Sequence, residues 1–367
     1  MRPLILQTHE STSLPRCEQV LREGGLLGLP TETVYGLAAD ADQAQAVAAI
    51  FAAKGRPADH PLIVHVADMD GGLSGARYFS RDIPAFAMRL MQAFWPGPLT
   101  LILPRREGVA TAAAGGQDSV GLRCPAHPAA QALLRALRHR VQGSVVWGLA
   151  APSANRFGRV SPTTAQHVHS EFLAGSDEDK PATLLVLDGG PCEVGIESTI
   201  VDCTRGEPVL LRPGAIGLAE LSQACGHMVR LPHELTSAQA APRASGTLAA
   251  HYAPEAKVRL MDTAALQSAL QPGSAQRRAV AGRIGVYMRT RPDIASEQAA
   301  QPQDGLNGPP QLLLRAMPPD AARAAQHLFA TLRAMDDAGA KEIWVEATPE
   351  TTEWAGVADR LQRASVA

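Results

Sequence analysis

The stretch "DQAQAVAAIFAAKGRPADHPLIVHV", residues 42–66, joins a helical pattern to a short apolar run through a loop that contains two prolines. Its first part has apolar residues at helical spacing and ends at Gly55, a common residue after the last turn of a helix. The apolar run at 62–66 has the length of a buried strand. A helix that leads directly into a buried strand is typical of an α/β sheet.

Outward from this stretch, strand-like and helix-like segments alternate over the first two-thirds of the chain. Further helices are expected at 84–97, where Pro96 ends the pattern, and at 127–137. Residues 24–40 read as a strand that runs into a loop, and further strands are expected at 99–104, 119–125, 144–154, 183–190, 198–204 and 208–214. Strands with helices between them predict an open α/β sheet over residues 1–231.

The composition changes after about residue 231. Residues 232–256 are rich in small residues and prolines, which predicts a linker or an extended loop. Beyond it, short strands are expected at 257–262, 283–289, 311–318 and 342–347, and an amphipathic helix at 321–339. Residues 257–367 are therefore expected to form a second, smaller α/β domain.

The overall composition excludes several classes of protein. The chain has 367 residues, 46% of them hydrophobic, and a net charge of −2, which is not the strongly basic balance of a stand-alone nucleic-acid binder. Its five cysteines form no C-x-x-C pair, so neither a zinc site nor a disulfide framework is indicated. The first ten residues contain too short an apolar run for a signal peptide, and no run approaches the length of a membrane span. A cytoplasmic protein is expected.

Polar residues gather at the ends of the predicted strands, although the usual nucleotide-binding and hydrolase motifs are absent. Ligands bind at strand ends in open α/β sheets, so these loops are expected to converge on one cavity. The residues concerned are Thr31, Glu32, Thr33, Tyr35, Lys54, Arg56, His60, His65, Ser119, Arg123, Ser153, Asn155, Ser161, Ser198 and Arg212.

Each of these signals also has a plain structural interpretation. Lys54 and Arg56 follow a helix, where cations favour the negative end of the helix dipole. Ser153 and Asn155 lie in a proline-flanked loop and are common turn formers. His65 within an apolar strand is often a hydrogen-bonded core histidine rather than a catalyst.

Arg123 and Arg212 are harder to explain as structural residues. Arg123 lies inside an apolar strand, where an arginine requires an anion or a buried partner. Arg212 stands before a Pro-Gly pair in a similar setting. The joint occurrence of such residues around several strand ends favours a binding site for an anion.

The chain also resembles a known family through several motifs that occur in order. They are "PTETVYGL" at 30–37, "KGRPADHPLIVH" at 54–65, "VGLRCP" at 120–125, "APSANRFGRVSPT" at 151–163, "GIESTIVD" at 195–202 and "LRPG" at 211–214. These motifs look like those of the YrdC-like threonylcarbamoyl-AMP synthases, over roughly residues 14–217. "SGTLAAHYAP" at 245–254 and the small domain behind it resemble the long, two-domain form of that family.

The resemblance implies a fold and an activity. The fold is a twisted open α/β sheet domain with a concave, positively charged face, followed by a linker and a smaller Rossmann-like α/β domain. The implied activity is that of a nucleotidyltransferase that condenses L-threonine, bicarbonate (or carbon dioxide) and ATP, with Mg²⁺ on the phosphates, to threonylcarbamoyl-AMP and pyrophosphate. The product is used by threonylcarbamoyl transferase proteins to modify an adenosine in tRNA, and a weak direct contact with tRNA is compatible with this role.

The same resemblance assigns individual residues. It gives Lys54 and Arg56 a catalytic role. It places Arg56, His60, Ser119, Ser153, Asn155, Ser161, Arg212 and Tyr252 at ATP. It places Thr33, His65, Arg123, Ala151 and Ser198 at L-threonine, and implies no metal ligand from the protein. The family usually has asparagine where this chain has His60.

Three alternatives remain at this point. The basic face could hold double-stranded RNA without chemistry, although the net charge of −2 argues against this. A carbamoyltransferase-type activity is known for the same fold in hydrogenase-maturation proteins, whose zinc-finger segments are not matched by any Cys-x-x-Cys pair in this chain. The linker with His251 and Tyr252 is interpreted as a lid over the nucleotide, and the alternative is that Tyr252 packs against the small domain.

Overall fold

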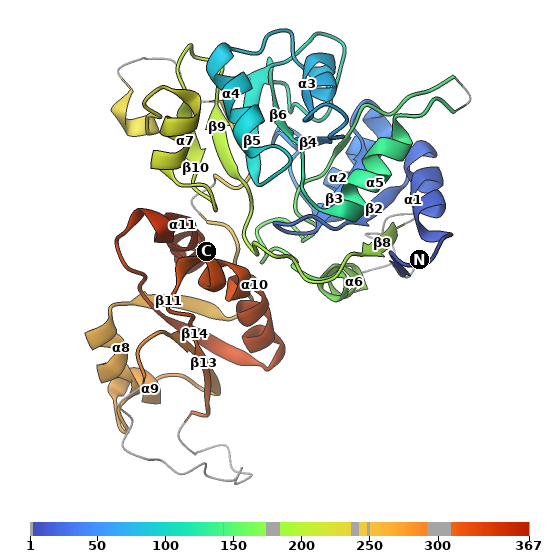
Figure 1. The fold of residues 1–367 in the computed structure, drawn as a ribbon. Coiled ribbons are helices and arrows are strands. Elements are labelled where there is room, and N and C mark those ends of the chain that lie inside the picture. Colours follow the sequence, from blue (N-terminus) through green and yellow to red (C-terminus); the bar gives the residue numbers. More distant parts are fainter. Residues whose placement is uncertain are drawn as a thin grey trace. The chain divides into compact units, whose positions relative to one another are not determined.

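The computed structural model describes residues 3–141, 143–173, 184–235, 242–247, 250–291 and 310–366. The chain forms two compact units (Figure 1). The first comprises Met1–Phe157 and Ser161–Leu248, and the second comprises Gly158–Val160 and Ala249–Ala367. The division at 248 falls within the segment 232–256 that is expected to be a linker, and the first unit extends beyond its expected end at residue 231.

A mixed sheet forms the centre of the first unit. Within the described residues it has ten strands, in the order β1 (Leu4–Gln7), β8 (Leu184–Asp188), β2 (Leu26–Leu29), β3 (Gly36–Asp40), β7 (Gly148–Ala150), β4 (Ile63–Val66), β6 (Ser119–Arg123), β5 (Leu99–Pro104), β9 (Thr199–Asp202) and β10 (Val209–Arg212). Strands β4 and β6 are parallel, and their register pairs His65 with Arg123. Two residues of the predicted site are therefore neighbours on adjacent strands.

Helices cover this sheet on both faces. They are α1 (Ser13–Arg22), α2 (Ala44–Lys54), α3 (Leu73–Phe79), α4 (Ala85–Phe94), α5 (Pro128–Leu137), α6 (Ala165–Leu173) and α7 (Leu218–Cys225), with a short 3-10 turn at Pro232–Glu234. Successive strand residues point to opposite faces, so Leu26 belongs to one apolar cluster and Leu27 to the other. The larger cluster includes side chains of α2, α3, α4, α6 and α7, and the smaller includes those of α1 and α5.

The connection from α2 to β4 positions the first cations of the site. Helix α2 ends because Gly55 adopts the left-handed conformation, with a φ of 61°, and its N–H donates to Ala52 O. The Arg56 N–H then donates to Phe51 O, so the chain reverses tightly around the helix end. Lys54 and Arg56 thereby lie on one buried turn that leads into β4.

Most predicted elements of the first unit are confirmed. The helices expected at 42–55, 84–97 and 127–137 are α2, α4 and α5. The strand expected at 144–154 is confirmed only at Gly148–Ala150, the part that pairs with both β3 and β4. Residues 36–40, expected to be a loop, form β3.

Several elements of the first unit were not predicted, among them β1, α1, α3, α6 and α7. Strand β1 has four residues and α3 has seven, which is too short for a periodic pattern to be visible in the sequence.

The second unit contains a parallel sheet. Within the described residues its four strands lie in the order β11 (Lys257–Met261), β14 (Ala340–Glu346), β12 (Arg283–Met288) and β13 (Leu312–Ala316). The helices are α8 (Thr263–Leu270), α9 (Ala275–Arg278), α10 (Ala321–Asp337) and α11 (Ala355–Val366), with a 3-10 turn at Thr352–Trp354. The expected helix at 321–339 is confirmed as α10, and its predicted apolar face is buried. Helices α8, α9 and α11 were not predicted. No helix in the described ranges has both the length and the apolar character that a membrane span requires.

Candidate functional site

Lys54, at the end of α2, donates hydrogen bonds to the loop after β7. Its side chain is buried, and its Nζ atom donates to Ser153 O at 2.5 Å and to Asn155 O. Burial lowers the Lys54 pKa well below its usual value, and the neighbouring Arg56 lowers it further. Lys54 is thus in direct contact with the backbone of Ser153 and Asn155, two other residues of the predicted site.

Arg56 and Arg212 converge on Ser245. Both arginines are buried. The Nη2 atom of Arg56 donates to Ser245 Oγ at 3.2 Å and to Pro61 O at 2.9 Å, and the Nη1 atom of Arg212 donates to Ser245 O at 2.8 Å. Two cations that are 156 positions apart in the numbering (56 and 212) therefore share one small residue as a partner. The backbone and hydroxyl oxygens in these contacts carry no net charge.

The segment around Ser245 is held on the first unit by its own neighbour. Arg243 Nη1 lies 2.6 Å from Asp59 Oδ2, and the Arg243 N–H donates to Gln117 Oε1 at 2.8 Å. A pocket with an empty volume of about 280 Å³ lies beside this segment. Its lining includes Ile63, Thr100, Ile102, Ser119, Gly121 and Ser245. Ser119, predicted to contact ATP, thus lies at a hollow of the sheet rather than at a flat surface.

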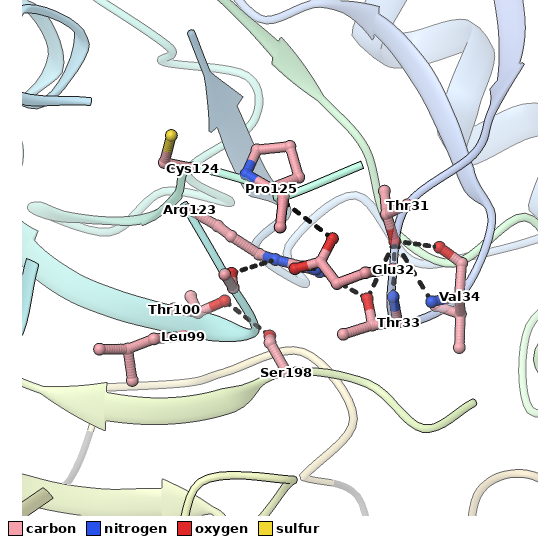
Figure 2. A network of polar contacts seen from close by, with 12 residues as sticks. Thr31, Glu32, Thr33, Val34, Leu99, Thr100, Arg123, Cys124, Pro125 and Ser198 are labelled. Atoms are coloured by element: carbon pink, nitrogen blue, oxygen red, sulfur yellow. Dashed lines mark hydrogen bonds and ion pairs between the residues drawn. The ribbon is translucent and has the colours of Figure 1, made fainter. Parts of the chain in front are cut away.

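Arg123 lies at the centre of a second buried cluster (Figure 2). Its Nη2 atom is 2.7 Å from Glu32 Oε1, its Nη1 atom donates to Thr33 Oγ1 at 2.7 Å, and its Nε atom donates to Gly97 O at 3.2 Å. The second Glu32 oxygen accepts the Ala126 N–H at 3.1 Å. Arg123 and Thr33, which are predicted to bind L-threonine, are therefore in direct contact.

Ser198 contacts the cluster around Arg212. Its Oγ atom is 2.7 Å from Thr100 Oγ1, as Figure 2 shows. The Arg212 Nη2 atom donates to Ser198 O at 2.8 Å and to Ser198 Oγ at 3.2 Å. A residue predicted for L-threonine thus contacts a residue predicted for ATP.

The histidines of the site differ in burial. His65 is buried beside Arg123, and burial, with the charge of Arg123, lowers its pKa to about 3. Its imidazole is therefore neutral near pH 7. His60 is partly buried, with its ring edge-on to Phe157 at a centroid distance of 5.4 Å. Burial and the nearby Arg56 lower the His60 pKa, which also favours a neutral ring.

The remaining predicted residues occupy distinct positions. Ser161 is buried, and its hydroxyl donates to Glu197 Oε1. The Ala151 N–H donates to Ile63 O at 2.9 Å, next to β4. Tyr252 belongs to the second unit, where it is 1% exposed, with its ring 5.4 Å from that of Phe329. Its contact with ATP stays a prediction.

Three residues of these clusters were not singled out by the sequence analysis: Thr100, Glu197 and Ser245. Glu32 was expected at the site but received no ligand role. Glu197 was detectable in principle, because it is an acidic residue adjacent to the predicted ligand residue Ser198 in a motif. Ser245 begins the "SGTLAAHYAP" motif. Thr100 carries no signal, since it looks like an ordinary strand residue until its partner Ser198 is known.

Over the described ranges, no group of three or more His, Cys, Asp or Glu side chains is arranged to hold a metal ion. The donors that meet at the two clusters are guanidinium, ammonium and hydroxyl groups, which suit phosphate and carboxylate oxygens.

Two family models match the chain. The family described as Telomere recombination matches residues 19–214, and the C-terminal domain of threonylcarbamoyl-AMP synthase matches residues 216–366. Their border at 214–216 lies just after β10. Together they account for nearly the whole sequence.

Relatives named threonylcarbamoyl-AMP synthase are similar to this chain in sequence. The threonylcarbamoyl-AMP synthase of Pyrococcus abyssi is 41% identical over 238 residues, which is 65% of this chain and 64% of that protein, just under two thirds of its length. The threonylcarbamoyl-AMP synthase of Schizosaccharomyces pombe is 33% identical over 371 residues, which is 92% of this chain and 84% of that protein.

Solved structures of Pyrococcus abyssi Sua5 are also similar. The complex of that protein with L-threonine has a TM-score of 0.76 and 32% identity, and covers 100% of this chain and 98% of that chain. A double variant of the same protein has a TM-score of 0.75 and 32% identity, over 99% and 96% of the two chains. This chain therefore belongs to the threonylcarbamoyl-AMP synthase family, in the long form with a second domain.

Proposed function

We propose that this protein condenses L-threonine, bicarbonate or carbon dioxide, and ATP to threonylcarbamoyl-AMP and pyrophosphate. The observation that carries the proposal is the direct contact of Arg212 with Ser198. It joins the residues assigned to the amino acid to those assigned to the nucleotide, so that both substrates meet in one place. The related Sua5 of Pyrococcus abyssi binds L-threonine in a solved structure, which supports the same substrate here.

The cluster around Arg123 suits an amino acid. A guanidinium recognises a carboxylate through two parallel hydrogen bonds, and Arg123 is held in one orientation by Thr33 and Gly97. The neutral His65 and the hydroxyl of Ser198 supply uncharged polar groups for the amine and the side-chain hydroxyl of threonine.

The cluster around Arg56 and Arg212 suits a triphosphate. A negatively charged carbamate must approach the negatively charged α-phosphate, and fixed cations lower that barrier by stabilising the charge of the transition state. Arg56 and Arg212 are assigned this role. Lys54, whose pKa is lowered by burial, is proposed to assist them by holding the backbone of Ser153 and Asn155 in place. His60, Ser119, Ser153, Asn155 and Ser161 are proposed as further ATP ligands from the first unit, and Tyr252 as one from the second.

The chemistry requires no covalent intermediate with the protein. The threonine amine loses a proton and forms a C–N bond with carbon dioxide, which gives a carbamate. A carbamate oxygen then forms a bond to the α-phosphorus, and the bond from that phosphorus to the pyrophosphate oxygen breaks. The protein acts by orienting the reactants and by neutralising charge.

Magnesium is proposed to arrive with the nucleotide. Mg²⁺ binds phosphate oxygens and lowers their effective charge when ATP is present. The arginine, lysine and hydroxyl groups of this chain would then contact the remaining phosphate oxygens. A magnesium ion that is bound by ATP rather than by the protein fits the donors of the site, where cationic groups rather than clustered carboxylates predominate.

The product also defines what must follow. A carbamoyl-adenylate is a mixed anhydride, so a second protein must transfer its threonylcarbamoyl group before water hydrolyses it. We propose that threonylcarbamoyl transferase proteins use it to modify adenosine in tRNA, with tRNA itself contacting this protein only weakly.

The direct test is pyrophosphate release from ATP. Release is expected only when threonine and bicarbonate are both present, and the adenylate should be identified by mass spectrometry. Release that is independent of threonine would contradict the proposal. Salt-sensitive RNA binding without any turnover would instead favour an RNA-binding module.

A further inference from the structure

Glu32 forms a buried ion pair with the arginine that is assigned to the substrate carboxylate. The side chains of Glu32 and Arg123 are 8% and 4% exposed, and the charged atoms are 2.7 Å apart. Such a pair is costly to break, because removal of one partner leaves the other charge buried and uncompensated. The unusual feature is its place: a protein carboxylate already contacts the group that must recognise the carboxylate of the amino acid.

The contacts of Arg123 show how both functions are compatible. A guanidinium carries five N–H donors. Over the described residues, Glu32, Thr33 and Gly97 contact three of its nitrogens, one each. Each of the two terminal nitrogens therefore keeps a second N–H, and two such N–H groups are what a bidentate carboxylate requires. Glu32 contacts one nitrogen of the guanidinium, so other N–H groups of Arg123 remain for a ligand.

Glu32 is itself fixed by the backbone. Its Oε2 atom accepts the Ala126 N–H at 3.1 Å, and its carbonyl oxygen accepts the Val194 N–H at 2.8 Å. The next carbonyl, Thr33 O, accepts the Gly195 N–H at 3.1 Å. Turns from two distant parts of the first unit thus clamp this loop. A carboxylate anchored in this way can fix the rotamer of Arg123, which a solvent-exposed partner could not do.

We propose that Glu32 is a positioning residue for substrate recognition: it orients Arg123 and balances its charge, so that the free N–H pair faces the α-carboxylate of L-threonine. The inference rests on the proposed function, because it assumes that Arg123 binds this carboxylate. It predicts that Glu32 acts on the amino acid and not on ATP.

The variant that tests this is Glu32→Gln, which keeps the shape and one acceptor but removes the charge. The threonine KM should rise about 10- to 100-fold, the range expected for loss of a charge-assisted contact, while kcat and the ATP KM stay within about twofold. Glu32→Asp, which restores the charge, should recover part of the loss. An unchanged threonine KM in a folded Glu32→Gln variant would overturn the inference, as would an equal rise in both KM values.

A matched control is available in the same sheet. Asp202 and Arg205 form another buried pair at 2.7 Å, with side chains 0% and 9% exposed, and neither residue is assigned to a substrate. Asp202→Asn should lower the melting temperature without changing the threonine KM. If both carboxamide variants changed the threonine KM alike, the effect of Glu32 would be structural and the inference would fail.

Two measurements separate positioning from direct contact. In a double-mutant cycle, Glu32→Gln should add almost nothing to the threonine KM in the Arg123→Gln background, because it acts through Arg123. Discrimination between L-threonine and L-threoninamide, which lacks the carboxylate charge, should fall in Glu32→Gln. Additive effects, or unchanged discrimination, would contradict the assignment.

Failure of the proposed function would look different. Threonine affinity is measured by calorimetry without ATP, whereas the reaction is measured by pyrophosphate release. A parent protein that binds threonine but releases no pyrophosphate would refute the function and leave the role of Glu32 standing. A parent that makes the adenylate, with a Glu32→Gln variant that binds threonine equally well, would refute the role of Glu32 alone.

Discussion

Each unit of the molecule holds a glutamate–arginine pair near the ends of strands of its sheet, and the two pairs are built differently. In the second unit Glu346 lies 3.3 Å from Arg289 Nη2 and also accepts the N–H groups of Arg289 and Thr290 and the hydroxyls of Thr263 and Thr290. In the first unit Glu32 contacts Arg123 and one backbone N–H. Glu346 is thus the centre of its network, whereas in the first unit the centre is Arg123.

The difference shows how one kind of pair serves two purposes. Burial raises the Glu346 pKa, but its hydrogen bonds to Thr290, Thr263 and Arg289 outweigh this and lower it overall. The donors of Thr263, Thr290 and the Arg289 backbone point at this carboxylate, which stabilises the turns after β11, β12 and β14. At Arg123 the donors point outward from the cation, and some are left for a ligand. The first arrangement predicts effects on stability, and the second predicts effects on substrate use.

The largest effect should follow from loss of the central carboxylate of the second unit. Glu346→Ala removes the acceptor of four hydrogen bonds, two from backbone N–H groups and two from threonine hydroxyls, and should reduce the free energy of unfolding by about 3–5 kcal/mol. Hydrogen exchange should speed up in β12 and β14, and the threonine KM of the folded fraction should not change. Unaltered exchange in these strands, or a selective change in threonine KM, would break the comparison.

Arg56→Ala should have the next largest effect, and on catalysis. It leaves a phosphate charge uncompensated, at a cost of about 2–4 kcal/mol in the barrier, by analogy with loss of one transition-state donor. Adenylate formation should fall about 30- to 1000-fold, measured by pyrophosphate release, while the melting temperature is nearly retained. Arg135→Ala is the control, since that arginine is 54% exposed in a surface pair with Asp68. Normal turnover by the Arg56 variant would show that Arg56 only stabilises the end of helix α2 and takes no part in catalysis.

Arg123→Ala and Ser198→Ala compare a charged and a neutral contact at the predicted threonine site of the first unit. Arg123 would lose a charge-assisted contact of about 1.5–3 kcal/mol, and Ser198 a neutral hydrogen bond of about 0.5–1.5 kcal/mol. Both should chiefly raise the threonine KM, Arg123→Ala more than Ser198→Ala. Equal or inverted effects in steady-state kinetics would contradict the assignment of the carboxylate to Arg123.

An effect that is small over any single pH unit concerns the pH dependence of stability through His65. Its pKa is about 3 in the folded protein against an ordinary value of 6.5, so the unfolded chain binds one more proton between these values. Stability should therefore fall as the pH drops from 6.5 towards 3, by up to about 1.4 kcal/mol per pH unit from this residue. His65→Gln should flatten that slope in urea unfolding at several pH values. An unchanged slope would show that His65 is protonated, or exposed, in the folded state.

Local sequence determined much of this protein. The helical spacing before Gly55 and the apolar run after Pro61 predicted α2 and β4, because helix termination and strand burial depend on neighbouring residues. The motifs around Arg56, Arg123 and Ser198 also marked residues that gather in two clusters.

Tertiary structure alone decided the partners. Nothing local shows that Glu32 faces Arg123, that Thr100 faces Ser198, or that Ser245 lies between Arg56 and Arg212. These contacts join residues that are far apart in the chain, on strands whose order in the sheet is not their order in the sequence. A periodic pattern reports which face of its own element is buried, but the opposing side chain depends on how all the elements pack together.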